Sequence, residues 1–190
     1  MLYIAANIIV PTQFAGYSMM SQTVSELSAV NSPTRALWLA LVVPYGFLLI
    51  AFGWGVWLSA AERTSLKVAG VLLIAYGVLG FFWPPMHLRG DEFTLTDTLH
   101  IVWAAITVPL MMLQIVFAAA GLGRDIRIYS AVTLVILVLF GVLTGLDGPN
   151  IAANLPTPYV GIWERISIGA YMIWVIVFAV VLLREKSIRD

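Results

Sequence analysis

Five long stretches of this chain contain no Asp, Glu, Lys, Arg or His, and this feature limits its fold more than any other. They hold 26, 19, 23, 19 and 18 residues and fill the intervals Arg35–Glu62, Lys67–His87, His100–Arg124, Arg127–Asp147 and Arg165–Arg184. A helix needs about 20 apolar residues to cross the hydrocarbon core of a bilayer. Each stretch therefore predicts a transmembrane helix, and we expect these helices near residues 36–60, 66–86, 98–121, 128–146 and 163–184.

The N-terminal segment predicts a sixth, shorter span. Residues 2–10 are apolar, and Pro11, Thr12 and Gln13 follow them. Because a proline inside a helix removes a backbone hydrogen bond, we expect a short or tilted first helix over residues 2–20 that breaks near Pro11. The expected fold is an all-α bundle of six transmembrane helices, which forms a single domain over residues 1–190 with both termini on the same side.

Composition excludes the other broad classes of protein. The chain is 61% hydrophobic and 11% charged, whereas soluble domains carry about 25% charged residues. A net charge of +0 with no basic patch argues against binding to nucleic acid. The absence of cysteine excludes disulfides and thiolate ligands. We expect the lipid bilayer as the environment and no cofactor.

The basic residues predict an orientation. With six spans, the side that carries the short connections and the C-terminus holds seven of the ten: Arg63, Lys67, Arg124, Arg127, Arg184, Lys186 and Arg189. The other side holds Arg35, Arg89 and Arg165. Cytoplasmic loops carry an excess of Lys and Arg, so both termini are expected in the cytoplasm, in a cell (inner) membrane. The longer connections 21–35, 87–97 and 147–162 then lie outside and hold most of the polar chemistry.

The most informative polar segment is residues 86–100, MHLRGDEFTLTDTLH. Asp97 and His100 are three residues apart, so they share one face of the fourth helix, which Thr96 or Asp97 is expected to cap. A metal site would need His87 to fold back over this helix start and join them. We favour no metal here, and we keep these residues and Arg89 as candidates for binding a ligand.

A second polar segment runs from Gly145 to Arg165. Thr157 followed by Pro158 predicts the N-cap and first turn of the last helix. Glu164 and Arg165 then lie inside that helix, where charges are expensive unless they are paired. We expect Glu164 to face the bundle and to meet His100 or Arg35, and Arg165 to reach Asp147 or the headgroups. Asp147 and Asn150 complete the candidates from this segment.

The third polar segment is residues 20–38, MSQTVSELSAVNSPTRALW. Thr23 and Glu26 have the spacing of a capping box, which predicts a short outer helix over residues 24–30. Ser32 and Pro33 predict the start of the second span. Glu26 and Arg35 join the candidate ligand-binding residues.

Three stretches together resemble one family. They are SQTVSELSA after the short first span, the proline-rich end of the third span that leads to His100, and the Glu164-Arg165 pair in WERISIG. They resemble the bacterial and archaeal multi-pass membrane family known as domain of unknown function 998. The resemblance covers nearly the whole chain and implies a helical bundle, but it supplies no reaction. The short first span departs from the family pattern.

Three functions fit these observations. In the first, a polar pocket on the outer side binds or moves a small or lipidic ligand. In the second, the chain is an outward-facing lipid hydrolase or transferase that uses His100 with Asp97 or Glu164. In the third, it is a structural subunit that packs against a copy of itself or a partner membrane protein through its glycine-rich helices. No nucleophile motif is present, which favours the first.

Overall fold

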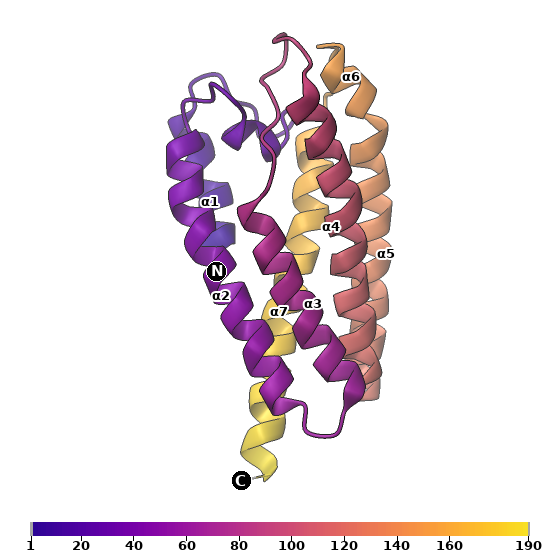
Figure 1. The fold of residues 1–190 in the computed structure, drawn as a ribbon. Helices are drawn as coiled ribbons and strands as arrows, with labels where there is room; N and C mark the ends of the chain where they lie inside the picture. The colour runs from indigo at the N-terminus through magenta and orange to yellow at the C-terminus, as the bar shows by residue number, and fades with distance from the viewer. Residues whose placement is uncertain (1, 190) are drawn as a thin grey trace.

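The computed structural model describes the backbone of residues 2–189 and the side chains of residues 2–185. Its five long helices are α2 (Arg35–Ser59), α3 (Thr64–Phe81), α4 (Leu95–Ala120), α5 (Arg124–Leu146) and α7 (Val160–Arg189). The shorter elements are α1 (Leu2–Ile9), α6 (Gly148–Ala152) and the 3-10 helices η1 (Val10–Gln13) and η2 (Ser25–Ser28). The long helices run side by side as a bundle (Figure 1).

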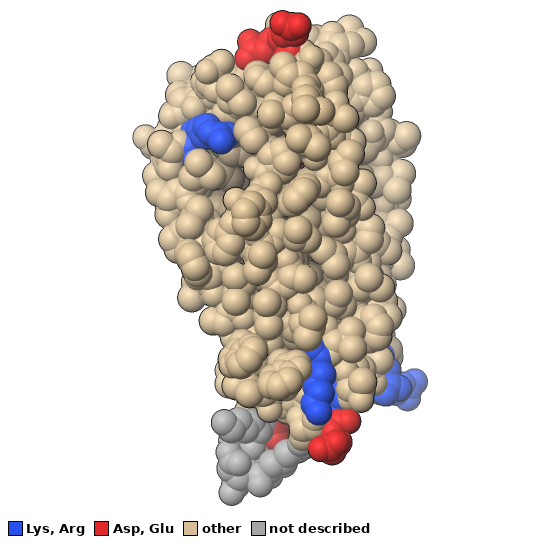
Figure 2. Space-filling model, in the orientation of Figure 1, with Lys and Arg blue, Asp and Glu red and all other residues tan. Residues whose placement is uncertain are grey.

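All five long helices have the length and apolar composition of membrane spans. The five expected helices are therefore found, with shifted ends, and each is able to span a membrane by its length and composition. The third helix stops at Phe81 instead of residue 86, because Pro84 and Pro85 disfavour helical backbone in the residues before them. Figure 2 shows charged side chains at the two ends of the bundle and a broad band without them between.

The N-terminal helix is shorter than the expected segment 2–20. It changes from α1 into η1 at Val10, and Pro11 occupies the first turn of η1, where its missing N–H costs nothing. The expected break near Pro11 is thus found, but helical structure ends at Gln13. In Figure 1 this segment lies beside only part of the length of α2.

Helices α2 and α3 form a hairpin through residues 60–63, and small residues bring their backbones together. A Cβ added at Gly53 of α2 would lie 2.7 Å from the carbonyl oxygen of Gly70 on α3. Close approach of this kind is how helices associate in lipid, where burial from water no longer drives them together.

A few buried polar side chains join the helices deep in the bundle. The hydroxyl of Tyr171 on α7 donates to Gln114 on α4, whose amide donates to the Leu72 carbonyl oxygen of α3 at 3.2 Å. The indole of Trp174 donates to the Ser130 hydroxyl of α5 at 2.9 Å. These pairings satisfy polar groups that water cannot reach.

The two ends of the bundle differ. At the short-loop end, which carries residues 60–63 and 121–123, Arg63 makes a 2.6 Å ion pair with Glu185 of α7. At the opposite, long-loop end lie residues 14–34, 82–94 and 147–159, which connect the helices without regular structure except for η2 and α6. The segment 14–34 is called the cap below.

Candidate functional site

The cap is held against the start of α7 by Arg165. Its Nη1 donates to the carbonyl oxygens of Met19 and Gln22 at 2.9 and 3.1 Å, and its Nη2 donates to the Tyr17 hydroxyl at 2.6 Å. Arg165 therefore binds cap backbone, and the expected reach to Asp147 or the headgroups is wrong.

Tyr17 connects Arg165 to a second part of the cap. Burial raises the pKa of its phenol to about 12, although the neighbouring Arg165 acts in the opposite direction. The phenol thus stays protonated at neutral pH, donates to the Thr23 carbonyl oxygen at 2.6 Å and accepts from Arg165. One side chain thereby joins α7 to the middle of the cap.

A second arginine, Arg89, ties the cap to the loop between α3 and α4. It donates from Nε and Nη2 to the two carboxylate oxygens of Glu26, at 2.8 and 3.2 Å. The Glu26 side chain is fully buried and that of Arg89 is 15% exposed. Gly90 follows with φ +88°, which lets the loop turn directly after the arginine. A bidentate pair of this kind fixes orientation as well as distance.

The same arginine also reaches the third loop. Its Nη1 donates to the Thr157 hydroxyl at 2.6 Å, and that hydroxyl donates to the Ser21 carbonyl oxygen of the cap at 2.9 Å. Thr157 was expected as the N-cap of the last helix, and this is wrong, because α7 begins at Val160 and the hydroxyl is used between loops. Arg89 thus links all three connections at this end.

The cap is ordered from within by a capping box. The Thr23 N–H donates to Glu26 at 2.6 Å, and the Glu26 N–H donates to the Thr23 hydroxyl at 3.3 Å. This reciprocal contact, expected from the sequence, joins Thr23 to the first turn of the 3-10 helix η2, which at Ser25–Ser28 is shorter than the helix expected over residues 24–30. Ser32 was expected to begin the second span, but α2 begins at Arg35 and the Ser32 hydroxyl donates to the Leu27 carbonyl oxygen.

Asp97 organises the start of α4. It accepts from the N–H of Thr94 at 2.9 Å, and Thr94 is the N-cap, in place of the expected Thr96 or Asp97. Asp97 also accepts from the N–H of His87 at 2.7 Å and lies 2.8 Å from that residue's Nδ1. The loop residue His87 has therefore folded back over the helix start, and its ring is held by a buried carboxylate.

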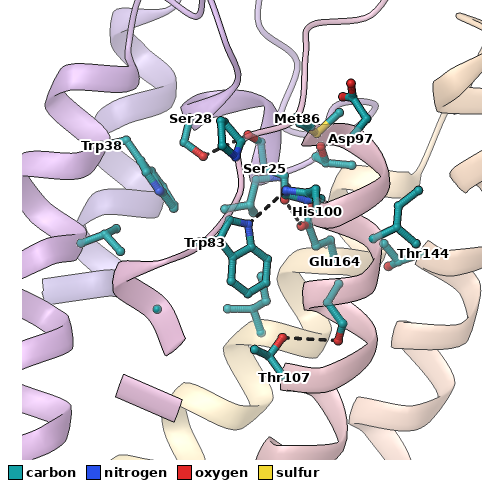
Figure 3. Close-up of a pocket in the computed structure, with 18 of the residues that line it drawn as sticks. Ser25, Ser28, Trp38, Trp83, Met86, Asp97, His100, Thr107, Thr144 and Glu164 are labelled. Carbon is teal, nitrogen blue, oxygen red and sulfur yellow. Dashed lines mark hydrogen bonds between the residues drawn. The ribbon is translucent and has the colours of Figure 1, made fainter. Parts of the chain in front are cut away.

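His100 lies on the same helix but has different partners. Its Nδ1 is 2.8 Å from the Pro84 carbonyl oxygen and 3.1 Å from the Trp83 indole nitrogen. A single ring nitrogen either donates or accepts, so it serves one of these at a time. Figure 3 shows the Trp83 and His100 rings meeting inside the cavity described next. Within the described residues, no three His, Asp or Glu side chains gather in a way that could hold a metal.

A cavity of about 740 Å³ lies under the cap, inside the half of the bundle next to the long-loop end. All five long helices contribute to its wall, from positions such as Leu49, Tyr76, Met111, Gly141 and Met172. These side chains are mostly apolar. Near the cap, Ser25, His100 and Glu164 face the cavity (Figure 3). The cavity is thus an apolar chamber with a polar region at one end.

Glu164 joins this polar region to the cap. Its carboxylate accepts from the Val24 N–H and lies 3.5 Å from the Ser25 hydroxyl. These contacts are to the cap, whereas we expected His100 or Arg35. Arg35 donates instead to the Ser28 carbonyl oxygen at the other end of η2.

The structure separates the ten candidate residues into two groups. Six line the cavity: Arg35, His87, Arg89, Asp97, His100 and Glu164. The other four lie outside its wall: Glu26, Asp147, Asn150 and Arg165. Glu26 and Arg165 hold the cap in place. Asp147 accepts from the Asn150 amide at 3.2 Å, and this local contact lies at the start of α6, to which Asn150 belongs.

Sequence reasoning missed the apolar part of the site. Tyr45 and Tyr76 lie in the middle of spans, away from the membrane interface where tyrosine is common. Their position in the sequence could have indicated the cavity, because a phenol hydroxyl inside a membrane protein needs either a polar partner or a cavity beside it. Tyr45 donates to the sulfur of Met172 at 3.4 Å.

The comparisons place the chain in one family. The family described as "Protein of unknown function (DUF998)" matches residues 1–181, so the chain belongs to it, as the three stretches of the sequence predict. No curated protein and no solved structure matches the chain.

Proposed function

We propose that this multi-pass membrane protein binds or moves a lipidic ligand in the cavity under its cap. The observation that supports this most is the division of the cavity into an apolar chamber and a polar end beside Ser25, His100 and Glu164. Its volume of about 740 Å³ is in the range of pockets that hold drug-sized ligands, ~300–1,000 Å³. A molecule with a hydrocarbon part and a polar head matches both regions.

The surroundings of the cavity favour a ligand that comes from the bilayer. Ile101 and Val108 on α4 and Gly145 on α5 line the cavity and are exposed residues. We propose that the cavity opens towards lipid between these two helices. A lipid could pass sideways into the chamber without crossing water.

The orientation is part of the proposal. The chain forms one domain with six spans, if the N-terminal helix is counted as a span. The protein lies in the cell (inner) membrane, its cap and cavity face outward, and both termini are in the cytoplasm. The seven-to-three distribution of Lys and Arg supports this.

A pair of reporter fusions tests the orientation. A reporter active only in the cytoplasm should work when fused after Asp190 and fail when fused at Asn154, because the two positions are on opposite sides. The reverse pattern would contradict the orientation and place the cap inside the cell.

A second candidate function is hydrolysis or group transfer on the same lipid. The observation in its favour is the 2.8 Å contact of His87 with Asp97. A carboxylate that accepts from Nδ1 leaves Nε2 with its lone pair, as a general base requires. His87 would then take the role expected of His100. Release of fatty acid from a lipid ester by the purified protein would decide for this function.

Filling the chamber should remove lipid binding. Gly141 on α5 lines the cavity, and an added Cβ there would meet only the Ser167 hydroxyl, at 3.8 Å. We expect Gly141→Trp to fold and to lower the amount of lipid bound per chain by at least about tenfold. Native mass spectrometry of protein extracted in mild detergent measures this amount.

The matched control is Gly55→Trp on α2. Gly55 also has open space around it, but it does not line the cavity. It should bind lipid as the unaltered protein does. Equal binding by both variants would contradict the proposed function.

A further inference from the structure

Two cations line the cavity, and they differ in their partners. Both carboxylate oxygens of Glu26 neutralise Arg89. Within the described part of the chain the Arg35 side chain makes no ion pair, and its Nη1 donates to the Ser28 carbonyl oxygen. Its guanidinium therefore keeps donors for an anionic group at the polar end of the cavity.

The acidic side chains on the cavity wall either accept hydrogen bonds from other protein groups or are exposed on a loop. Asp97 accepts from His87 and Thr94, and Glu164 accepts from Val24 and Ser25. Asp91 and Glu92 are exposed, on the loop between α3 and α4. The cation that is left without a carboxylate is thus Arg35.

The turn η2 brings this cation close to hydroxyl groups. Glu164 binds the start of η2, Arg35 binds its end, and Ser25 and Ser28 of the same turn line the cavity between them. A guanidinium beside hydroxyl groups matches a phosphate that carries a glycerol-like hydroxyl, because the guanidinium fork fits phosphate oxygens.

We infer that the ligand is a phosphate-bearing amphiphile with one hydrocarbon chain in the chamber and its phosphate at Arg35. This inference rests on the proposed function and specifies its ligand. The chain would lie along Tyr45, Leu49 and Met111, and the hydroxyl of the head would meet Ser25 or Glu164. A cavity of about 740 Å³ has room for one such chain.

Two probes that differ only in the phosphate test the inference. Purified protein is titrated with lysophosphatidic acid and with the monoacylglycerol of the same chain length. We expect the phosphate-bearing probe to bind at least about tenfold more tightly. Inorganic phosphate at the same concentrations should not displace it, because free phosphate lacks the chain. Displacement would assign the site to a free anion and overturn the inference.

Two variants of equal charge complete the test. Arg35→Gln should remove the preference for lysophosphatidic acid and keep binding of monoacylglycerol. Arg124→Gln should leave the preference intact, since Arg124 is exposed at the short-loop end and does not line the cavity. Equal affinity of the unaltered protein for both probes would overturn the phosphate assignment and leave the proposed function standing. Failure of both probes to bind would contradict both.

Discussion

Replacing Arg89 with alanine should destabilise the folded protein by about 3–5 kcal/mol, because it leaves a buried carboxylate without its partner. Glu26 is fully buried, and its carboxylate oxygens accept from Arg89 at 2.8 and 3.2 Å. The same change also removes the hydrogen bond from Arg89 to Thr157 and so weakens the attachment of the third loop, which keeps the Thr157–Ser21 contact. Thermal unfolding in detergent, followed by the fraction of protein that remains monodisperse, measures the loss.

Two variants show whether the ion pair is the cause. Arg124→Ala removes an exposed arginine and should change stability by no more than ~1 kcal/mol. The double variant Glu26→Gln with Arg89→Ala buries no unpaired charge, so it should be more stable than Arg89→Ala alone. If Arg89→Ala unfolds at the same temperature as Arg124→Ala, the pair does not hold the loops together.

The second large effect is expected at Gly161, in the first turn of α7. A Cβ there would collide with the backbone carbonyl oxygens of Met19 and Gln22, which are also the acceptors of Arg165. Gly161→Ala should therefore push the cap off the bundle, with a loss of at least ~1–3 kcal/mol. Limited proteolysis should then cut within residues 14–34, while the helices stay intact.

Gly169 provides the control on the same helix. It has nothing within 4 Å of an added Cβ, so Gly169→Ala should be neutral or stabilise α7 by up to ~1 kcal/mol. The two substitutions are chemically identical, and only the contact with the cap differs. A similar response of both variants would show that the cap is not packed on Gly161.

The long helices could be predicted from the sequence because the membrane restricts which residues each span can contain. A span in lipid excludes charge over its full length, so the gaps between ionisable residues mark it whatever its neighbours are. The ends of the helices were less predictable. Thr157 and Ser32 have the local pattern of N-caps, but each hydroxyl has a partner elsewhere and the helix begins three residues later.

The site was harder to predict, because its contacts join residues far apart in sequence. Arg89 and Glu26 are 63 residues apart, and Arg165 and Met19 are 146 apart. Neither pair has a spacing that a helix period could reveal. His87 and Asp97 were expected to meet only if a metal joined them, whereas the histidine's own N–H and ring bring them together. Asp147 and Asn150 were equally polar candidates, but they contact each other only locally, at the start of α6.

We propose above that the cavity under the cap holds a lipid. A density map of the protein purified from membranes in mild detergent tests this most directly. We expect elongated density along Tyr45 and Met111, with a head beside Arg35 and Ser25, and its loss in the map of Gly141→Trp. A cavity without elongated density in the unaltered protein, or one closed by side chains of α4 and α5, would contradict the claim.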